Sequence, residues 1–426
     1  MTRSIRMIAL LAVLALLIAA CGGDDAAGTT EGSTETTSET SDTTAGDSTD
    51  TTMSDSTETT ATSGEADGEP IEVGIVTSTS GALQSYGQQY LDGLEAGLAY
   101  ATDGTNAVNG RPIEFVINDD GGDPETAITA ATELVGNGVT IIAGTVVSGV
   151  AIQMASFADE NQILYVSGPA ATDALTGANG YTFRSGRQSY QDVATAASLI
   201  EGDSGSVLVF AQDTEFGAAN VAAVEAVLGT KGFTVDSLLV PASDTEFTGF
   251  ADQINQASPD LVFVAWAGET SGAMWQALGQ QQVFDTAPVA TGLADTVTWP
   301  FYGEAATGIS FLSHYFAGAP DNAVNDYMVE NVAAPDLFTP DGFVAAQMIV
   351  YALENAEATD VDGMVAALEG WTFDAPKGTQ TVRASDHAMI QPMFTASLVD
   401  DGSGNLSAEL IGTLAPEDTA PPEAGE

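Results

Sequence analysis

The sequence predicts an α/β protein built from two open sheets in series. From Pro70 to Leu414, short apolar runs alternate with segments of helical periodicity almost without interruption. A strand, a turn and an amphipathic helix in succession form one βα unit, and repetition of the unit builds a parallel sheet. The length of this region suits two domains of ordinary size.

The first set of units begins at Ile71. After the Ser-rich turn 77–85, the apolar residues from Tyr86 onward fall at helical spacing. Asp123 and Pro124 then supply a helix cap and a first-turn proline. We expect strands at Ile71–Val76, Ile113–Ile117, Val139–Ala143 and Ile163–Val166, and helices from Tyr86, from Pro124, after Ser148 and after Thr172.

The same rhythm restarts after Gln191 and predicts a second sheet. We expect strands at Val207–Phe210, Thr234–Val240, Leu261–Ala265 and Pro288–Thr291, and helices at Gly217–Leu228, through Phe250 and Ile254, and around Met274–Leu278. A return strand at Gly308–Phe316 and a long helix at Asp341–Ala356 follow. The apolar stripe of that last helix requires a core to cover it.

Two of the predicted strands end at small hydroxylated residues, and each leads into a helical start. Ser148 and Gly149 follow the first, and Gly168–Thr172 follows the second. Two helix N-termini are therefore expected to point at one place, where free N–H groups bind an anionic or carbonyl oxygen without any Lys or Arg. Ligands of such sheets bind outside the carboxyl ends of the strands, so we expect a small-molecule site between Ser148 and Thr172. Two ordinary βα turns are the alternative.

The N-terminal 20 residues are predicted to be a secretory signal. Arg3 and Arg6 precede the apolar run Met7–Ala20, which is too short to span a bilayer. Cys21 is the only cysteine, which rules out an intramolecular disulfide. Residues 21–69 are rich in Thr, Ser and acids and predict a disordered tether with an end-to-end distance of about 40 Å. At the N-terminus, the alternative is an uncleaved signal with a free thiol.

Residues 416–426 form a second acidic segment, a C-terminal tail to which the sequence assigns no function.

The charge balance is strongly acidic. The chain has 60 acids and 8 bases, for a formal net charge of −52. Nucleic acid and anionic lipid surfaces are therefore poor partners. Acids also occur in segments that look folded, such as Glu114–Glu125 and Asp236–Asp252. A salty extracellular habitat, in which screening relieves self-repulsion, and plain solubility both explain this surface.

Several motifs together resemble the leucine/isoleucine/valine-binding proteins, the type I periplasmic binding proteins that serve ABC importers. They are VGIVTSTSGALQSYG (73–87), NDDGGDPETA (118–127), IIAGTVVSG (141–149), ILYVSGPAATDAL (163–175), YTFRSG (181–186), FAQDTEFG (210–217) and FTPDGFVAAQMIVYAL (338–353). In addition, LIAAC (17–21) resembles a bacterial lipobox, which implies cleavage before Cys21 and lipid on that cysteine.

The resemblance implies two Rossmann-like lobes with open parallel sheets joined by three hinge crossings. The crossings are expected near Gly186, Ser313 and Gln391. Lobe 1 then comprises residues 70–186 plus 317–390, and lobe 2 comprises 187–316 plus 391–415. Ligand binding is expected to close the lobes, which is a population shift that a permease can detect.

The resemblance also implies the site residues. The residues that look like the family's carboxylate-binding groups are Ser148, Gly149, the backbone of Ala170 and Ala171, and Thr172. Tyr86 stands where the family covers its ligand with an aromatic ring. Phe216 and Trp266 are expected to form walls on the second lobe. Leu293 falls where amino-acid binders place a Glu for the ammonium, and Asp295 is a possible substitute. Without that acid, apolar or aromatic carboxylates and amides are expected to compete with leucine-like amino acids.

We therefore expect a monomeric, lipid-anchored solute receptor on the outer face of the cytoplasmic membrane. It would bind a branched-chain amino acid or a similar small carboxylate or amide for an ABC permease, without cofactor, metal or catalysis. A receptor that reports to a sensor is one alternative. A serine hydrolase is the other, because GDSG (202–205) contains Ser204 and the chain has His314 and His387. The segments DDGG (119–122) and DDGSGN (400–405) lack the ligand spacing of a calcium loop and read as turns.

Overall fold

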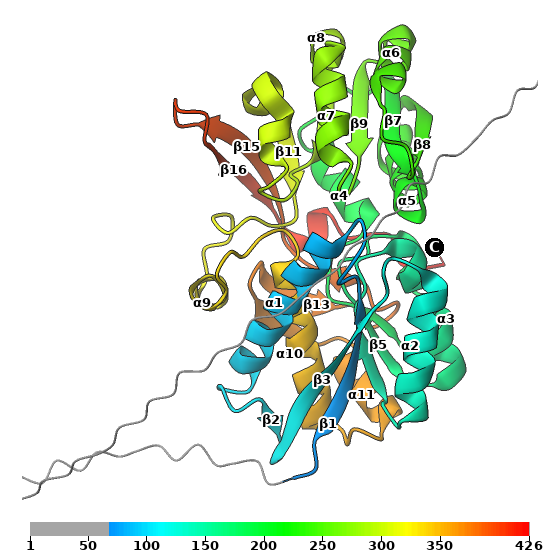
Figure 1. Cartoon of the computed structure of the whole chain (residues 1–426), viewed down its shortest axis with the longest axis vertical. Coiled ribbons are helices and arrows are strands. Elements are labelled where there is room, and N and C mark those ends of the chain that lie inside the picture. Colours follow the sequence, from blue (N-terminus) through cyan, green and yellow to red (C-terminus); the bar gives the residue numbers. More distant parts are fainter. Residues whose placement is uncertain (1–67, 426) are drawn as a thin grey trace, which may run out of the picture. The chain divides into compact units, whose positions relative to one another are not determined.

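A computed structural model describes residues 68–425 and shows two α/β lobes, each centred on its own sheet (Figure 1). The predicted fold class is confirmed. The predicted signal peptide, Cys21 and nearly all of the tether lie outside the described residues. Within the described part, Gly68 donates a backbone hydrogen bond to Gly110 and the Arg111 side chain binds the carbonyls of Glu69 and Pro70, so the chain enters the fold at a fixed point.

The first lobe contains a six-stranded sheet of order β2-β3-β1-β4-β5-β6. Its neighbours pair in parallel except for β2 and β3, which form a short antiparallel edge. Parallel pairing brings the carboxyl ends of the strands to one edge of the sheet. The strands are β1 (Ile71–Thr77), β2 (Ala107–Val108), β3 (Arg111–Asp119), β4 (Ile141–Ala143), β5 (Leu164–Ser167) and β6 (Thr182–Arg184).

Helices cover both faces of this sheet. They are α1 (Gln84–Ala101), α2 (Pro124–Gly136), α3 (Ser148–Asn161), α10 (Thr339–Asn355) and α11 (Val361–Leu368), and α9 (Ala323–Asn331) packs against α1. The α2 helix begins as predicted, because the Asp123 side chain accepts the Thr126 N–H and Pro124 occupies the first turn.

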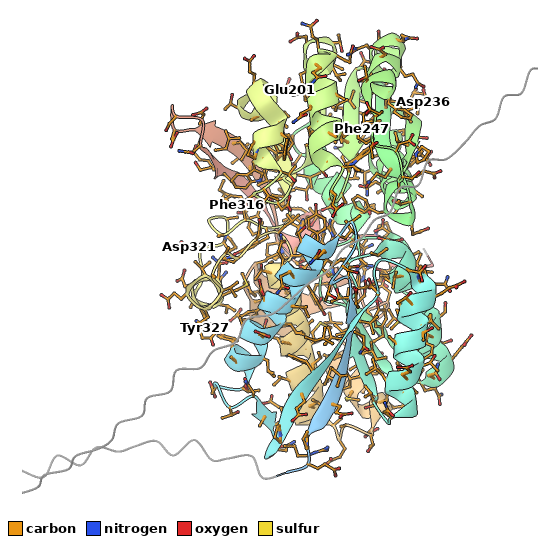
Figure 2. The ribbon with its side chains drawn as sticks, viewed as in Figure 1. Glu201, Asp236, Phe247, Phe316, Asp321 and Tyr327 are labelled. Atoms are coloured by element: carbon orange, nitrogen blue, oxygen red, sulfur yellow. The ribbon has the colours of Figure 1, made fainter. Side chains whose placement is uncertain are left out.

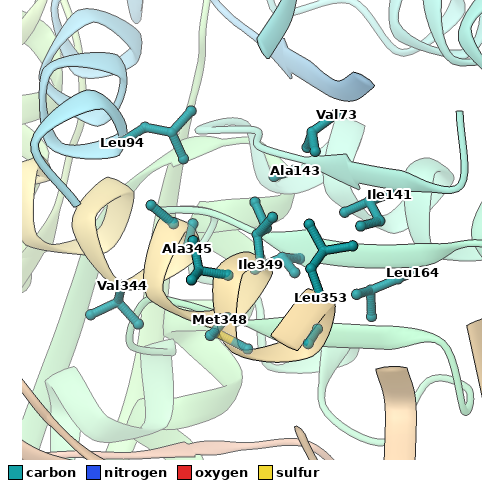
Figure 3. Packing of buried hydrophobic residues seen from close by; sticks show 14 of the residues in the cluster. Val73, Leu94, Ile141, Ala143, Leu164, Val344, Ala345, Met348, Ile349 and Leu353 are labelled. Carbon is teal, nitrogen blue, oxygen red and sulfur yellow. The ribbon is translucent and has the colours of Figure 1, made fainter. Parts of the chain in front are cut away.

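The long helix α10 supplies much of the core, as its apolar stripe predicted. Its residues Ile349 and Leu353 lie on the side of Ile141 and Leu164 of the sheet, and Met348 belongs to the same buried cluster (Figure 3). On its other side α10 packs closely on α1, where a Cβ at Gly342 would lie 1.9 Å from the Tyr90 carbonyl oxygen. Only glycine permits that approach.

The second lobe contains a seven-stranded sheet of order β16-β15-β11-β10-β9-β7-β8. The strands from β7 to β11 are parallel, and β15 and β16 extend the edge antiparallel. Its strands are β7 (Gly205–Asp213), β8 (Phe233–Pro241), β9 (Leu261–Ala265), β10 (Val289–Gly292), β11 (Ser310–Ser313), β15 (Met393–Asp400) and β16 (Leu406–Leu414), and its helices are α4 (Ser189–Ala197), α5 (Glu215–Val224), α6 (Thr248–Ala257), α7 (Ser271–Gln280) and α8 (Val283–Thr286).

The chain passes between the two sheets three times: after β6, after β11, and between β14 (Met389–Ile390) and β15. β14 belongs to a small antiparallel sheet with β12 (Thr372–Ala375) and β13 (Gly378–Val382). Buried charges gather at these passages. Lys377 and Asp341 form an ion pair at 3.3 Å with both side chains fully buried. Acids such as Glu201, Asp236 and Asp321 are instead exposed (Figure 2).

Several details differ from the sequence prediction, which did not include the helices α4, α9 and α11. The helix expected after Thr172 is wrong, because the chain forms only a single 3-10 turn, η1 (Asp173–Leu175). The Arg184 guanidinium binds the carbonyl oxygens of Ala170 and Thr172 and holds that segment away from helical geometry. The expected return strand at Gly308–Phe316 is shorter in the structure, where β11 spans Ser310–Ser313. The antiparallel strands β12 to β16 were not predicted.

The C-terminal tail is bound to the fold. After β16 in the second lobe, Thr419 is fully buried, and the carbonyls of Pro421 and Pro422 accept hydrogen bonds from Arg383 at 2.7 and 3.1 Å. Arg383 also pairs with Asp386, which accepts the Ala424 N–H. Arg383 and Asp386 lie between β13 and β14 of the small antiparallel sheet. The tail therefore links the second lobe, where β16 ends, to this small sheet.

Deletion of residues 419–426 should therefore lower the free energy of unfolding by about 1–3 kcal/mol, because Arg383 loses two charge-assisted hydrogen bonds. Urea denaturation measures this. Glu423→Gln, which changes the charge of the exposed tail without removing a carbonyl, should stay within about 0.5 kcal/mol. Equal stability of the deletion and the parent would show that the tail contributes nothing.

Candidate ligand-binding site

A cavity of about 470 Å³ lies between the two lobes. Its walls come from the loops that follow β1, β3, β4 and β5 on the first lobe and β7, β9 and β10 on the second, together with the segment before α10. These loops follow the carboxyl ends of parallel strands, which is where α/β sheets bind ligands. The sequence analysis expected a site at these strand ends, between Ser148 and Thr172; Ser148 lines the cavity and Thr172 does not.

Two acids of the DDGG turn hold the first-lobe loops together. Asp120 is fully buried and accepts hydrogen bonds from the hydroxyls of Ser78 and Thr145, which lie on two other loops. Asp119 accepts from the Ser80 hydroxyl and from backbone N–H groups, and the Ser80 hydrogen bond lowers the pKa of Asp119 to about 2. These acids fix the loops, as turn residues do.

The N-terminus of α3 faces the cavity with unmet hydrogen-bond donors. Ser148 and Gly149 line the cavity, and the N-cap residue Val147 provides no side-chain cap. Within the described residues, the N–H groups of Ser148, Gly149 and Val150 have no hydrogen-bond partner. A Cβ at Gly149 would meet no atom within 4 Å. Such a helix end binds anions.

Six of the predicted site residues line the cavity: Tyr86, Ser148, Gly149, Ala171, Phe216 and Trp266. The other three do not. The Ala170 N–H is already bonded to the Thr145 carbonyl at 3.3 Å, and the Thr172 hydroxyl contacts Glu215 Oε1 at 3.2 Å. Asp295 is buried beside the cavity, where its carboxylate accepts the Thr298 hydroxyl at 2.5 Å. Burial raises the pKa of Asp295, and the Thr298 hydrogen bond opposes that shift.

The second helix end at the cavity belongs to α5, on the other lobe. The Thr214 side chain caps it by accepting the Gly217 N–H at 3.2 Å, and Thr214, Glu215 and Phe216 line the wall. Trp266 stands nearby with its Nε1–H bonded to the Thr270 hydroxyl at 2.9 Å. This wall is mainly apolar and aromatic.

The side chains of the cavity that sequence reasoning missed include Arg187, Asp192, His314 and Phe338. The sequence analysis required no Lys or Arg for binding at the helix ends, but Arg187 lines the cavity. The Arg187 guanidinium lies 5.5 Å from the centre of the Phe338 ring and donates to the Pro169 carbonyl at 2.8 Å. The one available signal was the pair of arginines in RSGR (184–187), in a chain with only 8 bases.

The charges of these groups follow from their burial. Asp192 pairs with Arg187 at 3.2 Å; burial raises the pKa of Asp192, and Arg187 opposes that shift. Burial and the nearby Arg187 lower the pKa of His314 well below its usual value. His314 is therefore neutral at pH 7, and the part of the chain that the structure describes places one cation, Arg187, on the cavity wall beside the buried carboxylate of Asp192.

The lobes are in contact at the rim of the cavity. The Gly268 N–H donates to the Tyr86 hydroxyl at 3.4 Å, and the Glu269 N–H donates to the Ala82 carbonyl at 3.3 Å. The contact between Thr172 and Glu215 also joins the two lobes. Gly268 has φ +81°, and a Cβ there would lie 2.6 Å from the Ala82 carbonyl oxygen.

Among the described residues, Ser204 has no histidine within hydrogen-bond distance that could act as its base. It is exposed in the turn before β7. His387 hydrogen-bonds to the Thr182 carbonyl and Glu369, and His314 lies on the cavity wall. Neither histidine contacts Ser204 as a base would.

Comparisons with known proteins agree with this geometry. The family described as "Periplasmic binding protein" matches residues 70–403. A Leu/Ile/Val-binding protein homolog 3 of Brucella melitensis is 25% identical over 342 residues, which is 78% of this chain and 92% of the relative. The crystal structure of an ABC-type branched-chain amino acid transporter protein of Rhodopseudomonas palustris has a TM-score of 0.71 at 30% identity, and the match covers 84% of this chain and all of that one (100%).

A second solved structure shares the fold. The solute-binding protein of an ABC transporter from another Rhodopseudomonas palustris strain, in complex with p-hydroxybenzoic acid, matches with a TM-score of 0.75 at 22% identity over 84% of this chain and 99% of that one. The resemblance drawn from the motifs is thus confirmed. The chain belongs to the periplasmic binding protein family and is a type I protein of the leucine/isoleucine/valine-binding kind.

Proposed function

We propose that this protein captures a small apolar or aromatic carboxylate, amino acids included, between its two lobes and delivers it to an ABC importer. The observation that carries the proposal is the cavity between the lobes, where the unbonded N–H groups of α3 face Arg187 and aromatic walls. A carboxylate satisfies those donors, and the walls cover the apolar remainder of the ligand.

The relatives support both parts of this proposal. One is named for leucine, isoleucine and valine, another for branched-chain amino acid transport by an ABC system, and a third contains an aromatic carboxylate. All share a carboxylate attached to an apolar body. Contacts at the rim favour a closed liganded form, which presents the transporter with a shape that the open form lacks.

We assign the predicted site residues accordingly. Ser148 and Gly149 bind the carboxylate, with the backbone at Ala171 beside them, and Tyr86, Phe216 and Trp266 enclose the apolar part. Ala170 and Thr172 act as positioning residues, because their polar groups are engaged with Thr145, Arg184 and Glu215. Asp295 supports the Leu293 loop through Thr298.

For localisation we propose a monomer held at the outer face of the cytoplasmic membrane by lipid on Cys21. Within residues 68–425, no helix is long and apolar enough to cross a membrane. The tether would then hold the lobes at a variable distance from the permease without fixing their orientation.

Cys21→Ala should release the protein from the membrane into the soluble fraction, because it removes the lipid acceptor. Intact-mass analysis of the parent should show a lipidated chain that begins at Cys21. An unmodified thiol in the membrane-bound parent would contradict the anchor.

Ser148→Ala should weaken binding of the carboxylate ligand roughly tenfold to hundredfold, because it removes a hydroxyl hydrogen bond to a charged group. A thermal-shift panel of leucine, phenylalanine, benzoate and p-hydroxybenzoate identifies the ligand, and calorimetry measures the change in affinity. Ser156→Ala on the exposed face of the same helix should bind as the parent does. Full affinity in Ser148→Ala would place the site elsewhere.

Gly268→Ala should lower ligand affinity roughly tenfold, because the new Cβ meets the Ala82 carbonyl only when the lobes close. Gly104→Ala is the matched control, since Gly104 has φ +79° and no atom within 4 Å of the added Cβ. It carries the same backbone strain without the contact between lobes. If the two variants bind equally well, closure at this rim does not contribute to affinity.

A further inference from the structure

Three buried side chains on the cavity wall carry polar atoms without partners. Arg187, Asp192 and His314 are 6%, 5% and 4% exposed. Within the described residues, Arg187 Nε, Asp192 Oδ1 and His314 Nε2 form no hydrogen bond. Arg187 and Asp192 approach to 3.2 Å without an aligned hydrogen bond. Buried polar atoms of this kind cost free energy unless something satisfies them.

The charges around the cavity decide which ligand group fits best. Among the described residues, its wall carries one cation, Arg187, against the carboxylates of Asp192, Glu215 and Glu269. Neutral His314 does not offset Asp192. A ligand that is only an anion would add negative charge beside Asp192, whereas a zwitterion adds none and brings a cation to it.

The arrangement of Arg187 and Asp192 suits the head group of an α-amino acid. An α-amino acid carries its carboxylate and its ammonium on the same carbon, and Arg187 and Asp192 lie side by side at 3.2 Å. We infer that Asp192 binds the ammonium of an α-amino acid, while Arg187 and the N-terminus of α3 bind its carboxylate. This inference rests on the proposed function and narrows its ligand class.

Among the described residues, the other two carboxylates of the wall are less suited to this role, because Glu215 already accepts the Thr172 hydroxyl and Glu269 is exposed. Leu293 lines the cavity without a polar side chain, and Asp295 is bonded to Thr298 and does not line it. Deaminated carboxylates were expected to compete with amino acids because the Leu293 loop supplies no acid for the ligand ammonium unless Asp295 does so. Asp192 comes instead from the first turn of α4, at the first passage between the lobes.

The wild-type protein tests the inference without any variant. Calorimetry should compare leucine with 4-methylpentanoate and phenylalanine with 3-phenylpropanoate, since each pair shares a carbon skeleton and differs only in the ammonium. At least one amino acid should bind about tenfold or more tightly than its deaminated partner. 2-Hydroxy-4-methylpentanoate, which offers Asp192 a neutral donor, should fall between leucine and 4-methylpentanoate.

Asp192→Asn should reverse the preference. The amino acid should lose about tenfold or more in affinity, while the deaminated acid should bind more tightly than to the parent, because Arg187 loses its competing carboxylate. A purely structural role would weaken both ligands together. Arg187→Met should weaken both, and Asp236→Asn on the exposed surface should change neither.

The outcomes separate the inference from the proposed function. Equal or tighter binding of the deaminated acids to the wild-type protein overturns the inference and leaves the proposed function standing. Loss of the preference in Asp295→Asn but not in Asp192→Asn also overturns it. If none of the compounds binds, both the proposed function and the inference fail.

Discussion

One buried guanidinium organises the region on which the site depends. Arg184 is 1% exposed, and its three hydrogen bonds hold the carbonyls of Ala170, Thr172 and Arg187 in place. Burial lowers its pKa to about 10, with Asp173 opposing the shift, so the side chain stays charged at neutral pH. A buried charge of this kind is tolerated only where carbonyls and carboxylates surround it. The loop after β5, the first passage between lobes and the orientation of Arg187 all follow from it.

The two lobes contribute different chemistry to the cavity. The first supplies the donors of α3, held by loops that Asp120 ties together, and the second supplies the aromatic wall around Trp266. Neither wall encloses a ligand alone. In the proposed function, closure would bring both walls to the ligand, and the rim contacts of Gly268 and Glu269 would stabilise the closed form.

The sequence predicted the parts of this structure that local patterns determine. The strands β1, β4 and β9 and the start of α2 at Asp123 follow from periodicity and capping chemistry. The cavity could be placed at the strand ends because parallel sheets leave a crevice there. The motifs from Val73 to Gly87 and from Ile163 to Leu175 were among those that indicated the family of periplasmic binding proteins.

The remainder depends on contacts between residues far apart in the chain. The turn after Thr172 is set by Arg184, and no local pattern announces that a guanidinium will bind those carbonyls. Phe338 reaches the cavity because α10 packs on α1 over long sequence separation. No sequence pattern singled out Asp192, and only the fold shows that it lies in the first turn of α4, buried beside Arg187.

The most direct test of this account is a crystal structure of the wild-type protein grown with leucine, or with whichever amino acid gives the largest thermal shift. The account predicts closed lobes with the ligand carboxylate at the N–H groups of Ser148 and Gly149 and its ammonium within hydrogen-bond distance of Asp192. A ligand bound outside the cavity, or one inside it with no polar contact to α3, would contradict it.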